Sequence, residues 1–261
     1  MGRSIVVTAG KGGVGKTTVT ANLGASLAKL GKSVVVMDMD IGLRNLDVVM
    51  GLENRVVYNV MDIIEGRCKI NQALVRDKHI ENLYLLPASQ IHNKDDIDVN
   101  KVVEIVDTLK ENFDYVILDS PAGIEKGFQS SIAPATEAIV VVTPDVSSVR
   151  DADRVIGIIE SKGTVSISLV INRYDPVMVQ KKKSLDFDGI VDILGVDVIG
   201  VIPEDKNIIE TTNRGEILVE YLPGSPASKE FMLVARRIEG EEIPVNVEGP
   251  NKGLFGILFR R

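Results

Sequence analysis

Short apolar runs recur along the chain at intervals that are typical of buried strands. They are Ile5–Thr8, Val34–Met37, Leu83–Leu86, Tyr115–Leu118, Ala138–Val142, Ile167–Ile171 and Val198–Ile202. Nearly continuous apolar runs indicate strands that helices cover on both faces. Between the runs lie helix-length segments with periodic apolar positions, the clearest being Thr17–Leu30, Val99–Asn112, Ser147–Ser161 and Ser225–Glu239. The alternation predicts a doubly wound, mostly parallel α/β sheet with helices on both faces.

The chain divides into one large domain and a distinct end. No glycine-, serine- or proline-rich linker interrupts residues 1–240, so we expect them to form a single domain. Residues 241–251 contain two prolines and several acidic residues, and they offer little to bury. We expect them to form an extended or mobile linker. Residues 252–261 form a separate apolar and basic tail.

Composition excludes several classes of protein. Aromatic residues make up only 4% of the chain and tryptophan is absent, which disfavours a stacking platform for sugars or single-stranded nucleic acid. The net charge of −7 argues against a broad polyanion-binding surface, and we interpret the run Lys181–Lys183 as a solvated loop. Cys68 is the only cysteine, so an internal disulfide is excluded and a reducing cytoplasm is favoured. The first residues are interpreted as a strand rather than a signal peptide, and no apolar run reaches the about 18 residues of a membrane span.

The segment Gly10–Thr17 has the spacing G-x-x-x-x-G-K-[ST] between a predicted strand and a predicted helix. Glycines in such a loop let backbone N–H groups surround phosphate oxygens, and the positive end of the next helix adds to the attraction. Lys16 is expected to reach the β- and γ-phosphates, and the Thr17 hydroxyl to bind Mg²⁺. The segment therefore predicts a nucleoside triphosphate site.

Carboxylates follow two of the predicted strands. Asp38 and Asp40 come directly after Val34–Met37, and Asp119 ends the next apolar run but one. Because the carboxyl ends of parallel strands share one edge of a sheet, these groups are expected near the phosphates. These aspartates either orient water and support Mg²⁺, or they only cap the loops that follow the strands. Asp119, followed by Gly123, has the form of a Walker B element.

Lys11 is a second lysine, at the beginning of the phosphate loop. It lies too far from the end of the loop to contact the same phosphates as Lys16. It is either a solvated surface charge or a group that reaches a phosphate bound to a second copy of the protein. With it, the loop K-G-G-V-G-K-T resembles that of the deviant Walker A P-loop ATPases (the MinD/ParA family). In that family this lysine crosses the interface of an ATP-sandwich dimer. The resemblance therefore implies an ATP-driven homodimer.

The same resemblance implies roles for other residues. Lys11, Lys16 and Asp40 would be catalytic, with Asp40 polarising the attacking water, and Thr17, Asp38 and Asp119 would hold Mg²⁺. Asn172–Asp175 is only weakly similar to the guanine-reading N-K-x-D motif, and its arginine favours ATP over GTP. In the family, Asn172 and the loop from Ile202 to Asp205 flank adenine. The implied nucleotide contacts are Lys11, Gly12, Gly13, Val14, Gly15, Lys16, Thr17, Thr18, Gly123, Asn172, Pro203 and Asp205.

The tail Lys252–Arg261 has three basic residues and no acidic residue. On a helical projection its apolar side chains share one broad arc, a pattern typical of an interfacial membrane helix; the alternative is a helix docked on the protein's own core. Ordering about ten residues offsets much of the burial gain, so one tail should bind weakly and two tails on a dimer strongly. The expected membrane residues are Lys252, Leu254, Phe255, Ile257, Leu258, Phe259, Arg260 and Arg261.

The core and tail together resemble the branch of the family that places the bacterial division site. Asp38–Asp47, Asp119–Glu125 and Val146–Asp151 also carry this similarity. The branch implies a cytoplasmic protein, peripheral on the inner face of the cell membrane when it holds ATP. It also implies recruitment of a division inhibitor, MinC, through a surface that includes Ser148 and Asp151. In some lineages a further partner, MinE, stimulates hydrolysis and release.

Other functions compete with this interpretation. A ParA-like DNA- or cargo-positioning ATPase shares the core but does not need the tail, and we expect no specific nucleic acid. A reductase of the nitrogenase iron-protein type needs more cysteines for its iron–sulfur cluster than this chain has. A P-loop kinase needs an acceptor pocket, for which the sequence shows no signature.

Overall fold

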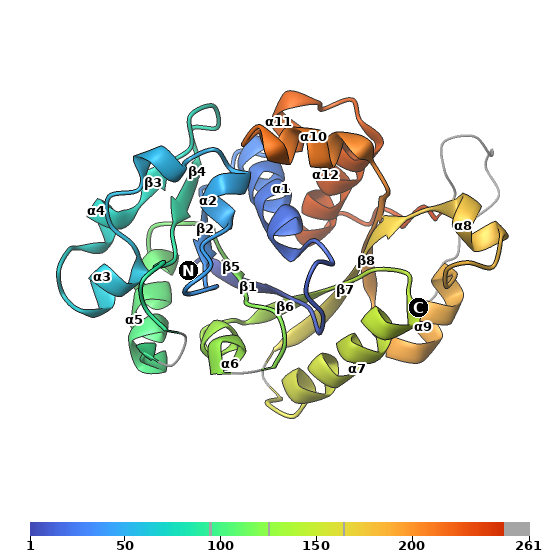
Figure 1. Ribbon diagram of the computed structural model, residues 1–261, viewed down its shortest axis with the longest axis horizontal. Coiled ribbons are helices and arrows are strands. Elements are labelled where there is room, and N and C mark those ends of the chain that lie inside the picture. Colours follow the sequence, from blue (N-terminus) through green and yellow to red (C-terminus); the bar gives the residue numbers. More distant parts are fainter. Residues whose placement is uncertain (94–95, 125, 164, 248–261) are drawn as a thin grey trace.

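The computed structural model describes residues 1–247 apart from 94, 95, 125 and 164. Within these residues, eight strands form one sheet in the order β3-β4-β2-β5-β1-β6-β7-β8 (Figure 1). Neighbouring strands are parallel except for the pair β3 and β4. The strands are β1 (Arg3–Thr8), β2 (Val34–Asp38), β3 (Val75–Arg76), β4 (Leu83–Leu86), β5 (Tyr115–Asp119), β6 (Glu137–Val142), β7 (Ser166–Tyr174) and β8 (Val198–Pro203). The predicted mostly parallel sheet is confirmed.

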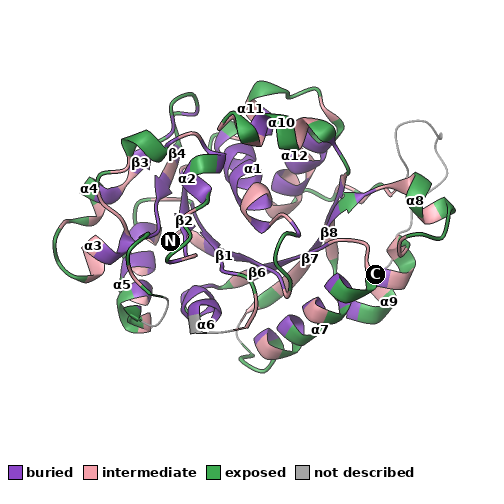
Figure 2. Cartoon of the chain, in the orientation of Figure 1, coloured by how far each residue is buried: buried purple, intermediate pink, exposed green. Residues whose placement is uncertain are grey.

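Helices cover both faces of the sheet. In Figure 1, α1, α11 and α12 lie on one face, and α5, α6, α7 and α9 lie on the other. The exposed residues of these helices point outward, while the strands between them are buried (Figure 2). The helices are α1 (Lys16–Lys29), α2 (Leu46–Val49), the 3₁₀ turn η1 (Glu53–Arg55), α3 (Val60–Ile64), α4 (Ile70–Ala73), α5 (Val99–Lys110), α6 (Lys126–Ile132), α7 (Val146–Glu160), α8 (Pro176–Gln180), α9 (Phe187–Leu194), α10 (Lys206–Asn213), α11 (Leu218–Tyr221) and α12 (Pro226–Ile238).

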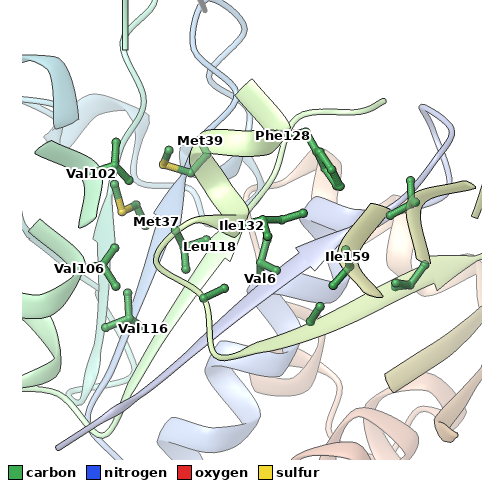
Figure 3. Packing of buried hydrophobic residues seen from close by; sticks show 14 of the residues in the cluster. Val6, Met37, Met39, Val102, Val106, Val116, Leu118, Phe128, Ile132 and Ile159 are labelled. Atoms are coloured by element: carbon green, nitrogen blue, oxygen red, sulfur yellow. The ribbon is translucent and has the colours of Figure 1, made fainter. Parts of the chain in front are cut away.

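The strands separate two hydrophobic cores because successive side chains point to opposite faces. In β1, Val6 belongs to one core, and its neighbours Ile5 and Val7 belong to the other. Figure 3 shows part of the first core, where side chains of β1, β2 and β5 pack against those of α5 and α6. Its labelled members include Val6, Met37, Leu118, Val102, Phe128 and Ile132. Burial on both faces explains why these strands are apolar without alternation.

The first part of the predicted linker is extended and is held against the domain. Arg237, near the end of α12, donates hydrogen bonds from Nε to the Ile243 carbonyl (2.9 Å) and from Nη2 to the Pro244 carbonyl (2.8 Å). Val247 packs at the border of the apolar core. The linker therefore starts from a fixed position, and its remainder and the tail lie outside the described residues.

The parallel order places the loops that follow β1, β2, β5, β6, β7 and β8 at one edge of the sheet. In doubly wound folds, ligands bind at this carboxyl edge, near the point where the strand order reverses. No helix among the described residues has the length and apolar character needed to cross a bilayer.

Candidate nucleotide-binding site

The phosphate loop is shaped by glycines that its surroundings require. Gly15, at φ 97°, is the residue before α1, and a Cβ there would lie 2.4 Å from Nδ2 of Asn172. At Gly10 a Cβ would lie 2.2 Å from the carbonyl oxygen of Asp151. The loop is thus packed between the last residues of β7 and the second turn of α7. Because α1 begins directly after Gly15, the backbone N–H groups of its first turn face the loop, as an anion site requires.

Thr17, in the first turn of α1, and Asp119, at the end of β5, are joined by a hydrogen bond. Thr17 Oγ1 donates to Asp119 Oδ2 at 2.7 Å, and Thr20 Oγ1 donates to Asp119 Oδ1 at 3.1 Å. Asp38 is paired with Asp119 in the register of β2 and β5. Thr17 and Asp119 thus bring together oxygen donors of the kind that Mg²⁺ prefers. Asp38 is their neighbour in the sheet, and its carboxylate oxygens accept from the backbone N–H groups of Asp40, Asn45 and Leu46.

The two aspartates have pKa values well above the ordinary range. Burial, together with the charge of Asp119, raises the pKa of Asp38 to about 7, against backbone N–H groups that lower it. Burial also raises the pKa of Asp119 to about 6, although the Thr17 hydroxyl and the Lys16 charge lower it. Two neighbouring carboxylates in a dry site favour a cation between them, because it removes the cost of their burial.

The loop that carries Asp40 is held from both sides. The Asp40 N–H donates to Asp38 Oδ1 at 2.9 Å, and the Gly42 N–H donates to the Ser89 carbonyl at 2.7 Å. Further along, Arg44 forms an ion pair of 2.7 Å with the fully buried Asp47. Asp40 is half-buried at the carboxyl edge of the sheet. The contact through Ser89 has no signal in the sequence, because it joins the loop to a segment distant from the motif.

Lys11 lies at the outer rim of the loop. Its Nζ donates to Ser147 Oγ at 2.7 Å and is 3.5 Å from Asp145 Oδ1. Partial burial raises the pKa of Asp145, but hydrogen bonds from Thr143, Ser147 and the Ser148 backbone, with the Lys11 charge, lower it to about 2. Lys11 is therefore separated from Lys16, which is 9% exposed at the start of α1. Neither contact of Lys11 was predicted from the sequence.

Only some of the residues expected to surround the base line the same cavity. Asn172 is 3% exposed, and its Nδ2 donates to the Val14 carbonyl at 2.8 Å. A small cavity beside it is lined by Gly15, Thr18, Asn172, Arg173, Glu204, Asp205, Ile208 and Ile209. The Asp205 carboxylate accepts from the Asn207 N–H and thereby caps α10. Pro203 lies on a different cavity, and so does Asp175.

The remaining predicted residues occupy separate places. Gly123, at φ 87°, follows Asp119 in the loop after β5. Ser148, predicted in the partner surface, is 2% exposed, and its Oγ accepts from the Thr143 N–H at 3.0 Å. Asp151 is half-buried one turn along α7. The tail, with Lys252, Leu254, Phe255, Ile257, Leu258, Phe259, Arg260 and Arg261, lies outside the described residues.

Comparison with known proteins gives consistent matches. Residues 5–219 match the family model of the CobQ/CobB/MinD/ParA nucleotide-binding domain. A septum site-determining protein MinD of Synechocystis is 53% identical over 244 residues, covering 94% of this chain and 92% of that protein. The MinC:MinD complex of Aquifex aeolicus is similar at a TM-score of 0.88 and 50% identity, covering 94% of this chain and 98% of that one. MinD of Pyrococcus horikoshii complexed with Mg-ADP is similar at a TM-score of 0.83 and 32% identity, covering 92% and 96%.

Proposed function

The chain belongs to the MinD septum site-determining ATPases of the CobQ/CobB/MinD/ParA nucleotide-binding family, and on this premise we propose a membrane-switching role. ATP with Mg²⁺ binds at the phosphate loop and joins two copies of the chain. The dimer attaches to the inner face of the cell membrane and holds a division inhibitor there. Hydrolysis to ADP and phosphate returns a cytoplasmic monomer.

The observation that carries the proposal is the separation of the two loop lysines. Lys16 begins α1 directly after the phosphate loop, and we assign it to the phosphates bound to its own chain. Lys11 lies at the rim, where Ser147 and Asp145 hold it at the start of α7. The Lys11 side chain is 45% exposed at this rim, which suits a phosphate held by a second copy. In the dimer the ATP phosphates compete with Asp145 for the Lys11 charge.

For hydrolysis, the chain's residues position water and stabilise charge. Water attacks the γ-phosphorus, and the bond from that phosphorus to the bridging oxygen of ADP breaks. Asp40 orients the water. The Lys16 side chain and the backbone N–H groups of the loop and the first turn of α1 stabilise the phosphate oxygens. These N–H groups belong to Gly12, Gly13, Val14, Gly15 and Thr18. Thr17, Asp38 and Asp119 would hold the Mg²⁺, which neutralises phosphate charge when bound. We assign the Gly123 amide to the γ-phosphate, as the sequence resemblance implies.

ATP is favoured over GTP by the two ends of Asn172–Asp175. Asn172 lines the small cavity beside the phosphate loop, whereas Asp175 accepts from the Val177 N–H and lines another cavity. A guanine-reading motif needs the asparagine and the aspartate on the same base. We place adenine between Asn172 and the loop of Pro203 and Asp205, as the sequence resemblance implies.

The division inhibitor is proposed to be MinC, by analogy with the Aquifex aeolicus complex. The exposed side of α7 at its beginning is the candidate surface. Ser148 itself is turned inward and braces Thr143, so the contacts would come from the exposed Val146, Ser147 and Arg150, with Asp151 beside them. MinE would act on the same ATP dimer where the organism has it.

Reconstitution tests the proposed function. The protein is mixed with MinC of the same organism and with vesicles containing phosphatidylglycerol, in the presence of ATP or ADP. We expect MinC to sediment with the vesicles only when both the protein and ATP are present. Equal sedimentation of MinC with ADP would contradict the proposal.

A further inference from the structure

A small group of apolar and cationic side chains on and after α8 is exposed and is not part of the nucleotide site. Val177 is 52% exposed and Met178 is 39% exposed on this five-residue helix. The next three residues, Lys181, Lys182 and Lys183, are all exposed. We call these five residues the α8 patch. Apolar side chains beside lysines are the composition of surfaces that lie against a lipid interface.

The three lysines of the patch are held in place by backbone but not by charge partners. Among the described residues none of them takes part in an ion pair, whereas Lys29, Lys32, Lys101 and Lys110 elsewhere do. Hydrogen bonds from the Lys182 N–H to the Val179 carbonyl (2.9 Å) and from the Lys183 N–H to the Met178 carbonyl (2.9 Å) close the turn after α8. The turn thus presents uncompensated positive charge to solvent.

Lys182 also occupies a conformation that glycine normally supplies. Its φ is 54°, in the left-handed region, at the position after a helix where glycine is strongly preferred. A lysine at such a position is strained, and strained residues concentrate at functional sites. The turn after α8 therefore has a lysine at a position where glycine would fit the backbone conformation better.

The α8 patch lies beside the point from which the tail departs. A groove of about 690 Å³ is lined by Pro176 of α8 and by Asn246 and Val247, the last described residues. Lys252, the first residue of the tail, is five residues further on, within about 17 Å along an extended chain. Arg237 fixes the start of this segment to the domain. Pro176, which precedes Val177 in the chain, therefore brings the α8 patch beside the last described residues.

The acidic residues that flank the patch in the sequence are engaged by the backbone. Asp175 accepts from the Val177 N–H at 2.8 Å, and Asp186 accepts from the Gly189 N–H at 2.9 Å. Both lie at helix beginnings, where the positive end of the helix offsets a carboxylate. Asp188 is the next acid along the chain and is exposed on α9.

We propose that the α8 patch is a second membrane contact, which touches anionic lipid headgroups next to the inserted tail. This inference rests on the proposed membrane function and names the surface that faces the bilayer. The lysines attract the headgroups, and Val177 and Met178 enter the outer edge of the interface. Anionic lipid is favoured over DNA because these apolar side chains gain nothing against a phosphate backbone and because Pro176 of α8 shares a groove with Asn246 and Val247, the last described residues before the tail.

The test compares vesicle binding by matched variants of the full chain with ATP. One variant carries Lys181→Gln, Lys182→Gln and Lys183→Gln, and a second carries Val177→Ser and Met178→Ser. The control removes the same charge elsewhere, through Lys69→Gln, Lys101→Gln and Lys162→Gln, which are exposed on other elements. Sedimentation uses vesicles of phosphatidylcholine with and without phosphatidylglycerol, and light scattering checks that every variant still dimerises with ATP.

We expect the triple-lysine variant to bind phosphatidylglycerol vesicles at least about tenfold more weakly than the control, since each lysine near the surface contributes. The serine variant should also bind more weakly, with little change in its dependence on phosphatidylglycerol. Equal binding by the patch and control variants would overturn this inference and leave the membrane function standing. Loss of retention on double-stranded DNA with unchanged vesicle binding would assign the patch to DNA instead. If the parent protein with ATP does not bind the vesicles, the proposed function itself is overturned.

Discussion

Thr17 Oγ1 and Asp119 Oδ2 lie 2.7 Å apart, so the first turn of α1 and the end of β5 meet at one point. Asp119 is 2% exposed, and its strand neighbour Asp38 is 1% exposed. A buried pair of carboxylates beside a hydroxyl is costly for the protein alone and favourable with a divalent cation. This relationship makes the affinity for Mg²⁺ sensitive to pH.

We predict that the affinity of the ADP-bound protein for Mg²⁺ rises with pH and levels off above neutrality. Burial raises the pKa of Asp119 to about 6 and that of Asp38 to about 7. Protons therefore occupy the site below these values and compete with the cation, and the competition disappears as pH rises through them. Titration calorimetry with Mg²⁺ across this range measures the effect. An affinity that does not change between pH 5 and pH 8 would show that these carboxylates do not hold the ion.

Lys16→Ala should weaken ATP and ADP binding at least about tenfold, because a charged hydrogen bond to phosphate is lost. Fluorescent-nucleotide titration measures the loss. The matched control is Lys29→Ala, at the opposite end of α1, which removes a lysine but faces Glu220. If both variants bind nucleotide as the parent does, Lys16 does not contact the phosphates.

Lys11→Ala should leave ADP affinity unchanged and abolish the dimer that forms with ATP. The side chain lies at the loop rim with Ser147 and Asp145, so its removal does not disturb the chain's own phosphate contacts. Light scattering with ATP and with ADP gives the mass in each state. If the Lys11→Ala protein still dimerises with ATP, Lys11 is only a surface charge that lies against the beginning of α7.

Asp40→Ala should reduce the turnover number about a hundredfold or more, while ATP binding and dimerisation persist. The carboxylate orients the attacking water, whereas the phosphate loop is untouched. Phosphate release under saturating ATP measures turnover, and light scattering confirms the dimer. Near-parental turnover by this variant would remove Asp40 from the mechanism.

The sequence predicted the sheet well because each buried parallel strand is apolar on both faces. All seven apolar runs are strands, and the phosphate loop lies between β1 and α1 as its spacing predicts. The short antiparallel β3 was not predicted, since Val75–Arg76 is too short to show a periodic pattern. The tertiary fold, and not local propensity, makes it a strand.

The sequence predicted which strand ends carry the site but not the contacts between them. Asp38 and Asp119 meet because β2 and β5 are neighbours, a pairing that no spacing along the chain encodes. Arg237 donates from Nη1 to the Ile199 carbonyl at 2.9 Å and so joins α12 to β8 without any motif in the sequence. Such contacts depend on how distant segments pack, and only the folded structure reveals them.

The tail is the feature on which the membrane switch depends. Deleting residues 252–261 should abolish binding to anionic vesicles and leave an enzyme that dimerises with ATP, because the deletion lies beyond the described domain. Phe255→Glu should have the same effect, since it places a charge in the acyl boundary. Phe255→Leu is the matched control and should bind like the parent. Unchanged binding after the deletion would make the tail a packing segment.

The most direct test of the central claim is sedimentation of the full-length protein with phosphatidylglycerol vesicles in ATP and in ADP. A single tail binds weakly, and two tails on one dimer bind together, so the nucleotide that joins the chains should decide attachment. We predict that the protein sediments with the vesicles in ATP and stays in the supernatant in ADP. Equal sedimentation in the two nucleotides would contradict the membrane switch.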